Sequence, residues 1–241
     1  MSNLASQCDE RHRGCFQKGV RPFLALVIFA ALLSASTSLA EANKSPGRFK
    51  AGAAVVREMN LARQHPDVYA RYLEELGAHF CGDFLVLPGR RMLRTREGVA
   101  AIDEAIRFLR RVHPAAPLIF SPGISLAAAE HVADQAAGAF GHGGSDHSNP
   151  GDRMNRHGTW SAIWGENISY GKATPRDVVI ALIIDDGLLS RKHRKNIFNP
   201  AFNYAGAAIG PHAGYRTVCS IDFAGSYIES ATDSRSLFAR N

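Results

Sequence analysis

The sequence predicts an α+β fold, in which helices pack against a small sheet. Several stretches ahead of residue 185 repeat apolar residues at helical spacing, and two β-like runs, 204–209 and 217–223, follow near the end. The turn Gly210–Tyr215 joins these two runs into a hairpin. Helices that precede and interleave with a few strands are typical of a sheet covered by helices.

Apolar spacing, proline and N-cap residues predict where the helices lie. The first stretch is 51–76, in which Pro66 breaks the apolar repeat and starts a second helix. Further helices are expected over 98–112, 124–139, 150–157 and 175–184. Residues 160–168 are expected to form a short buried run. Residues 77–97 are expected to be a long loop or insertion, because they contain Gly82 and Pro88–Gly89.

The first 40 residues have the composition of a secretory signal peptide. Four Lys or Arg residues precede the uncharged apolar run Pro22–Leu33, and Ser38 and Ala40 are small residues where a signal peptidase reads the chain. The alternative is an uncleaved membrane anchor, but the run is shorter than the roughly 20 residues that a spanning helix needs. We therefore expect a secreted or periplasmic protein, with a flexible lead-in over 41–52 and no membrane span after cleavage.

Cleavage after Ala40 would remove Cys8 and Cys15 and leave Cys81 and Cys219. Two cysteines in an exported domain indicate a disulfide first. The alternative is a pair of buried free thiols, because sequence does not determine pairing.

The charge balance argues against a nucleic-acid partner. The whole chain has a formal net charge of +6, and loss of four basic and two acidic residues with the signal peptide leaves +4. This mildly basic balance suits anionic cell-surface polymers or lipid headgroups. No cluster of Lys and Arg with interleaved aromatic residues occurs.

Three segments in the second half resemble a known family. They are GHGGSDHSNPGDR from Gly141, GENISYG from Gly165 and HRKNIFNPAF from His193. In this order they are similar to the signature segments of bacterial CAP-superfamily proteins, which carry the SCP-like extracellular domain. The resemblance covers roughly 53–225 and leaves 226–241 as a polar tail. It implies a three-layer α-β-α sandwich.

The resemblance also implies a site of two histidines and two acids. His142, Glu166 and His193 match the family's residues, His193 being the histidine that opens a late strand segment. Asp185 falls where the family often has Glu, and its neighbour Asp186 is the alternative. Neutral imidazoles bind Zn²⁺, and carboxylates either bind it or orient the rings. We expect these four residues to hold Zn²⁺ or another divalent cation.

Other interpretations of the same residues stay open. The four groups could instead hydrogen-bond the sandwich together. Ser145 and Ser148 lie near His142, but no GxSxG motif accompanies them. His131, alone within a helix, is expected to have a packing or hydrogen-bonding role. No residue is assigned to catalysis.

The sequence therefore predicts a secreted CAP-domain protein with a cleft of His and acid residues. We expect this cleft to bind a divalent metal and an extracellular ligand, which could be a lipid, a peptide or a cell-wall fragment. The alternative is a metal-dependent hydrolase that uses the same cleft. Whether the protein is an enzyme stays undecided at this stage.

The processing site is directly testable. We expect the mature protein to begin at Glu41, because the small residues end at Ala40. N-terminal sequencing of exported protein measures this. Exported protein that still carries residues 1–40 would contradict the prediction.

Overall fold

The computed structural model describes residues 49–89 and 91–230. The predicted signal peptide and most of the lead-in lie outside the described residues. The helices are α2 (Lys50–Gln64), α3 (Pro66–Gly77), α4 (Val99–Leu109), α5 (Pro122–Gln135), α6 (Pro150–Asn155), α7 (Pro175–Ile184) and α8 (Lys192–Phe198). The strands are β1 (Phe80–Cys81), β2 (Phe84–Leu85), β3 (Leu93–Arg94), β4 (Ile119–Phe120), β5 (Gly158–Tyr170), β6 (Tyr204–His212) and β7 (Arg216–Glu229).

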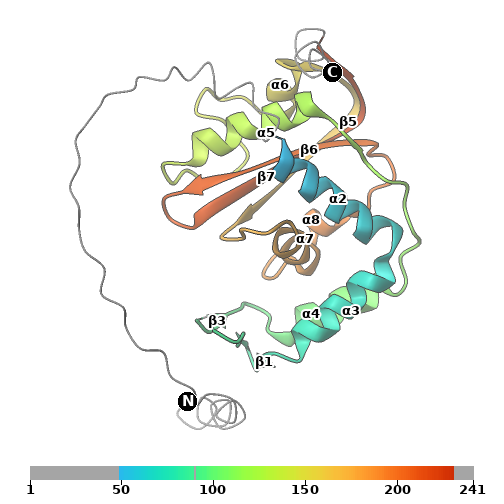
Figure 1. Ribbon diagram of the computed structural model, residues 1–241, viewed down its shortest axis with the longest axis vertical. Helices are drawn as coiled ribbons and strands as arrows, with labels where there is room; N and C mark the ends of the chain where they lie inside the picture. The colour runs from blue at the N-terminus through green and yellow to red at the C-terminus, as the bar shows by residue number, and fades with distance from the viewer. Residues whose placement is uncertain (1–48, 90, 231–241) are drawn as a thin grey trace, which may run out of the picture. The chain divides into compact units, whose positions relative to one another are not determined.

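The main sheet has the strand order β4-β6-β7-β5 (Figure 1). The predicted hairpin is present as β6 and β7, which pair antiparallel from Tyr204–Ala224 to His212–Arg216. Strand β5 pairs antiparallel with the other edge of β7, and the short β4 pairs parallel with β6. The α+β prediction is confirmed.

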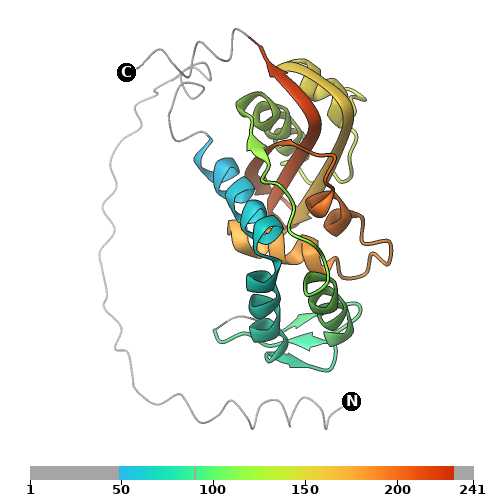
Figure 2. The same ribbon diagram turned by 90° about the vertical axis from the view of Figure 1, so that its right-hand side faces the viewer.

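Helices cover both faces of this sheet (Figures 1 and 2). Alternate side chains of β7 point to opposite faces, as in any strand. Cys219, Ile221 and Phe223 join the larger apolar core with α2, α3, α4, α7 and α8. Val218 packs with Val132 of α5, and Ala224 packs with Ile124 of α5 and Met154 of α6. The layers are therefore α5 and α6, then the sheet, then the remaining helices.

Small residues let helices on both faces approach the backbone of β6. A Cβ at Gly52 of α2 would lie 1.9 Å from the carbonyl oxygen of Ala207, and one at Gly206 would lie 2.2 Å from the amide nitrogen of Ser125 in α5. Real Cβ atoms do not approach other heavy atoms so closely, because atoms at these separations would overlap sterically. Strand β6 is therefore in direct backbone contact with α2 on one face and with α5 on the other.

Several predicted boundaries are corrected by the structure. Residues 77–97 form the small antiparallel sheet β1-β2-β3 and not only a loop. Helix α2 begins at Lys50, inside the expected lead-in, and β7 continues to Glu229, beyond the expected start of the tail. The segment that carries His193 is the helix α8 and not a strand.

The predicted Cys81–Cys219 disulfide is wrong. Cys219 is a free, fully buried thiol in the middle of β7. Its side chain points into the apolar core beside Ile221, and burial raises the pKa of the Cys219 thiol. Cys81 lies on β1, which belongs to the separate small sheet.

Arg63 joins α2 to three later segments. Its guanidinium is fully buried and donates to the carbonyl oxygens of Ala116 at 2.7 Å, Ile197 at 2.6 Å and Asn199 at 3.1 Å. Asn60, one turn earlier, exchanges two hydrogen bonds with the backbone of Leu118. These side chains satisfy backbone groups that no strand or helix pairs.

Replacing Arg63 should therefore be costly. We expect Arg63→Met, which keeps most of the side-chain volume, to lower the free energy of unfolding by roughly 3–5 kcal/mol, because buried carbonyl groups lose their donor. Chemical denaturation measures this. Arg71→Met is the control, since Arg71 is exposed and pairs only with Asp67; a change of about 0.5 kcal/mol or less is expected there. Equal losses in the two variants would contradict the prediction.

Candidate functional site

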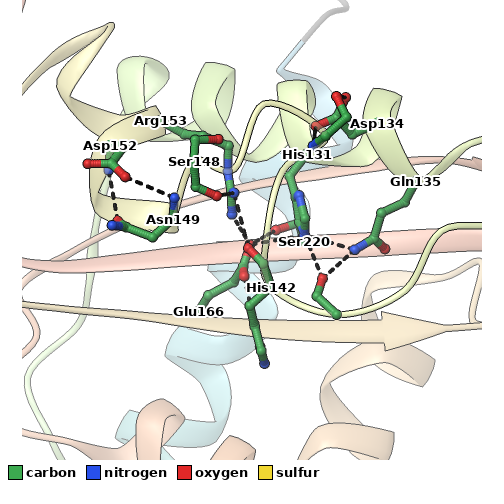
Figure 3. A network of polar contacts seen from close by, with 12 residues as sticks. His131, Asp134, Gln135, His142, Ser148, Asn149, Asp152, Arg153, Glu166 and Ser220 are labelled. Atoms are coloured by element: carbon green, nitrogen blue, oxygen red, sulfur yellow. Dashed lines mark hydrogen bonds and ion pairs between the residues drawn. The ribbon is translucent and has the colours of Figure 1, made fainter.

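A buried carboxylate, Glu166, is the centre of the polar network between the sheet and α5 and α6. It lies on β5, and its side chain is 1% exposed. Oε1 contacts Nδ1 of His142 at 2.7 Å. Oε2 accepts from Nη2 of Arg153 and from Oγ of Ser220, both at 2.9 Å (Figure 3). Both oxygens are thus engaged, and the carboxylate is compensated by a buried cation.

Helix α6 positions Arg153. The helix begins with a capping box, in which Asn149 and Asp152 each accept from the other's backbone N–H at 3.0 Å. From its first turns the fully buried Arg153 reaches Glu166, and its Nη1 also donates to the carbonyl oxygens of His142 and Ser148 at 3.1 Å. Arg153 therefore fixes the Gly141–Ser148 loop as well as the carboxylate.

The Gly141–Ser148 loop presents His142 to solvent. Gly141 has φ 97° and His147 has φ 65°, so the chain turns sharply at both places. Asp134 of α5 accepts from the backbone and the hydroxyl of Ser145 at 2.9 and 2.8 Å. The loop is thereby held while the His142 side chain remains 58% exposed. In Figure 3 one ring nitrogen of His142 points away from the network.

His131 lies in the buried floor of this network, on α5. Its Nε2 lies 2.8 Å from both the carbonyl oxygen of Gly141 and Nε2 of Gln135. Burial is the main cause that lowers the pKa of His131. The Gln135 side chain accepts in turn from the hydroxyl of Tyr170 at 2.9 Å. The hydrogen-bonding role expected for His131 agrees with these contacts.

Asp222 is a second buried acid beside Glu166. The two residues are directly opposite each other on β7 and β5, on the face that α5 covers. Asp222 is fully buried, and neither carboxyl oxygen has a hydrogen-bond partner if the group is ionised. Burial first, and then the charge of Glu166, raise the pKa of Asp222 well above its ordinary value. Because Glu166 already accepts from Arg153 and Ser220, the proton resides on Asp222.

The second predicted pair lies where α7 ends and α8 begins. Asp185 Oδ1 contacts Nδ1 of His193 at 2.7 Å, and Oδ2 accepts from the His193 backbone N–H at 3.0 Å. Asp186 does not take part, because its carboxylate accepts from the backbone N–H groups of Arg96 and Glu97. Of the two acids that the sequence left open, the structure places Asp185 against the imidazole.

A cleft of about 400 Å³ opens beside the first pair. It is lined by His142, Gly143, His147, Ser148, Asn149, Pro150, Trp164 and Glu166. Trp164 is 36% exposed and forms an apolar wall next to the exposed imidazole. Within residues 49–89 and 91–230, no three His, Cys, Asp or Glu side chains are grouped closely enough to hold one metal ion. The four predicted residues form two His–carboxylate pairs.

Sequence reasoning missed three members of the network: Arg153, Ser220 and Asp222. The signal for two of them is present in the alternation of β7. Ser220 and Asp222 interrupt an apolar strand at every second residue, so they share one face, and they face a helix. Asp222 lies directly opposite Glu166 in the register of β7 and β5, so the two acids are neighbours in the interior.

Comparison with known proteins identifies the domain. Residues 104–223, just under half of the chain, match the family described as CAP, the cysteine-rich secretory protein family. The chain carries a CAP domain. The matched region contains all four predicted site residues as well as Arg153, Ser220 and Asp222. The resemblance seen in the sequence is confirmed.

Bacterial proteins are among the similar chains. The uncharacterized protein YkwD of Bacillus subtilis is 39% identical over 67 residues, which are 28% of this chain and 24% of YkwD. The chain thus matches about a quarter of that relative's length. An extracellular SCP-domain protein of Bacillus anthracis (19% identity, TM-score 0.37) matches 52% of this chain and 37% of its own. An outer surface protein of Borrelia burgdorferi (16% identity, TM-score 0.37) matches 52% of this chain and 89% of its own.

The protonated state of Asp222 makes stability depend on pH in a defined direction. Because the pKa of Asp222 is raised in the folded state, the native state binds more protons than the unfolded state between the unfolded-state pKa, about 4, and the raised folded-state pKa. The contribution of Asp222 to the free energy of unfolding is therefore full at low pH and is lost as pH rises toward the folded-state pKa of this residue.

Asp222→Asn keeps the shape and a hydrogen-bond donor but carries no titrating proton. We expect wild type to lose free energy of unfolding relative to this variant as pH rises above about 4, by at most about 1.4 kcal/mol per pH unit, because the pKa of Asp222 is raised in the folded state. Urea denaturation across this range measures the difference. The exposed Asp103 provides the control: the free energy of unfolding of Asp103→Asn should change with pH in parallel with that of wild type. Parallel curves for Asp222→Asn would show that Asp222 is ionised when folded.

Proposed function

We propose that this CAP domain is an extracellular binding module that holds a divalent cation through the Nε2 atoms of His142 and His193. One observation carries the proposal: each imidazole gives its Nδ1 to a carboxylate at 2.7 Å. Metal-binding histidines have this arrangement, in which the carboxylate fixes the tautomer and leaves the other nitrogen unprotonated.

The two carboxylates would then orient the rings and would not bind the ion. Glu166 and Asp185 are 1% and 4% exposed, and every one of their oxygens already accepts a hydrogen bond. A bound cation such as Zn²⁺ would act as a Lewis acid that polarises a ligand oxygen. Neutral imidazoles suit Zn²⁺, and water molecules would complete its coordination.

The cleft beside His142 is the proposed binding place for an extracellular ligand. Trp164 and Pro150 give it an apolar wall, while His142 and Asn149 supply polar groups at the mouth. Pockets that bind small ligands combine apolar lining with a few polar groups in this way. Export of the protein is proposed on the signal-peptide pattern of residues 1–40. No helix within 49–89 and 91–230 is both long and apolar enough to cross a membrane.

Zinc titration by calorimetry tests the metal site. We expect His142→Ala and His193→Ala each to lower the affinity by more than the roughly 10–100-fold that Asp185→Asn should cost, since that residue only orients a ring. Binding should also weaken on acidification, because a protonated imidazole cannot bind metal. His113→Ala removes an exposed loop histidine and should leave binding unchanged.

Three outcomes are informative. Equal affinity in wild type and both site variants would end the metal-site proposal. Loss of affinity in only one variant would show that a single pair binds the ion. Hydrolytic turnover that disappears in His193→Ala would favour the hydrolase over the binding module.

A further inference from the structure

His193 lies between two arginines that both reach α4. Arg191 immediately precedes α8, and Arg194 lies in its first turn. Arg191 Nε donates to Oε2 of Glu104 at 2.6 Å, and Arg194 Nη1 donates to Oε1 of the same carboxylate at 2.9 Å. One acid on α4 therefore connects the residues on both sides of the candidate metal-binding histidine.

Glu97, just ahead of α4, accepts two hydrogen bonds from the Arg191 guanidinium, whereas Glu104 accepts one from it. Nη1 and Nη2 of Arg191 each lie 2.7 Å from a different oxygen of Glu97, and the side chains are 11% and 21% exposed. Nη1 also donates to the backbone carbonyl oxygen of Asp185 at 2.8 Å. Bidentate arginine–carboxylate pairs fix orientation as well as distance. Glu97 therefore fixes a guanidinium that in turn holds the backbone of Asp185.

The loop between α7 and α8, residues 185–191, is strained at both ends. Asp185 ends α7 with φ 57°, and Arg191 begins α8 with φ 50°. Left-handed conformations are unfavourable for residues other than glycine and persist only where the surroundings impose them. These two residues flank the turn that brings the Asp185 carboxylate against His193.

Reciprocal hydrogen bonds join this loop to the residues ahead of α4. Asp186 accepts from the backbone N–H groups of Arg96 and Glu97, both at 2.8 Å, and Glu97 accepts from that of Gly187 at 2.6 Å. The hydrogen bond from Arg191 is the main cause that lowers the pKa of Glu97 to about 2. The acid therefore stays ionised at neutral and mildly acidic pH.

We propose that Glu97 and Arg191 form a positioning clamp for the Asp185–His193 pair, holding the His193 ring with Nδ1 protonated and Nε2 free. Neither residue touches the imidazole, so both act through Asp185. Glu97 lies ahead of residues 104–223, so the clamp connects the matched CAP region to the segment before it.

Imidazole nitrogen NMR on the full mature chain tests this without any metal. Spectra are recorded with a chelator, at mildly alkaline pH and well below the unfolding temperature. Wild-type His193 should show one tautomer, protonated at Nδ1. Glu97→Gln, which keeps the shape but removes the charge, should give a mixture of both tautomers. It should also give roughly tenfold faster hydrogen exchange of the His193 amide, which Asp185 protects.

Two further variants sharpen the test. Arg191→Lys keeps the positive charge but cannot form the bidentate pair with Glu97, so it should reproduce the effect of Glu97→Gln. Glu74→Gln breaks an exposed pair with Arg110 at the other end of α4 and should leave the His193 signals unchanged.

The clamp is overturned if Glu97→Gln and Arg191→Lys lower the unfolding temperature but leave the His193 tautomer and amide exchange as in wild type. That result would give both residues a purely stabilising role. If Glu97→Gln does not fold, Asp186→Asn replaces it. This variant loses one of the two hydrogen bonds that Asp186 accepts from the backbone N–H groups of Arg96 and Glu97, and it should give the same tautomer mixture and faster amide exchange at His193. Because no metal is added, the result is independent of whether His193 binds zinc.

Discussion

The ion pair between Glu166 and Arg153 is the interaction on which the site depends. Both groups are almost completely buried, so neither would be tolerated in its charged form without the other. The pair connects β5 to α6, and Arg153 extends the connection to the loop that carries His142. Orientation of the exposed imidazole thus follows from a charge pair in the interior. Asp222 completes this interior group as a neutral acid beside the carboxylate.

The two His–carboxylate pairs are supported by different physical means. His142 is oriented from the core, through Glu166 and the residues that surround it. His193 is oriented from the surface, through a loop with left-handed residues and a set of arginine–glutamate contacts. The first pair therefore depends on the packing of α5 and α6, and the second depends on α4. The two pairs are also joined, because Asn167, next to Glu166 on β5, donates to the carbonyl oxygen of His193 at 3.0 Å, and Asn196 of α8 donates to that of Glu166 at 3.3 Å.

Local signals in the sequence were sufficient for most helices. Pro66, Pro122, Pro150 and Pro175 each stand in the first turn of a helix, where a missing N–H costs nothing. The short buried run expected over 160–168 is only partly correct: β5 extends from Gly158 to Tyr170, and its first half is largely exposed and contains a bulge with Ala162 at φ 72°. Glu166 and His142 were found by resemblance. Asp222 could have been found from the alternation of β7, but Arg153 depends on contacts between distant segments, which no local pattern encodes.

The close contacts of β6 limit where a ligand can lie. Gly52 brings α2 onto the backbone of Ala207, and Gly206 brings α5 onto the other face of the same strand. No acyl chain or sterol ring could be inserted there without separating a helix from the sheet. The cleft that we propose for a ligand lies away from these contacts, at the β5 edge, where Trp164 and the His142 loop line it. Across the middle of β6, the sheet is closed to an apolar ligand on both faces.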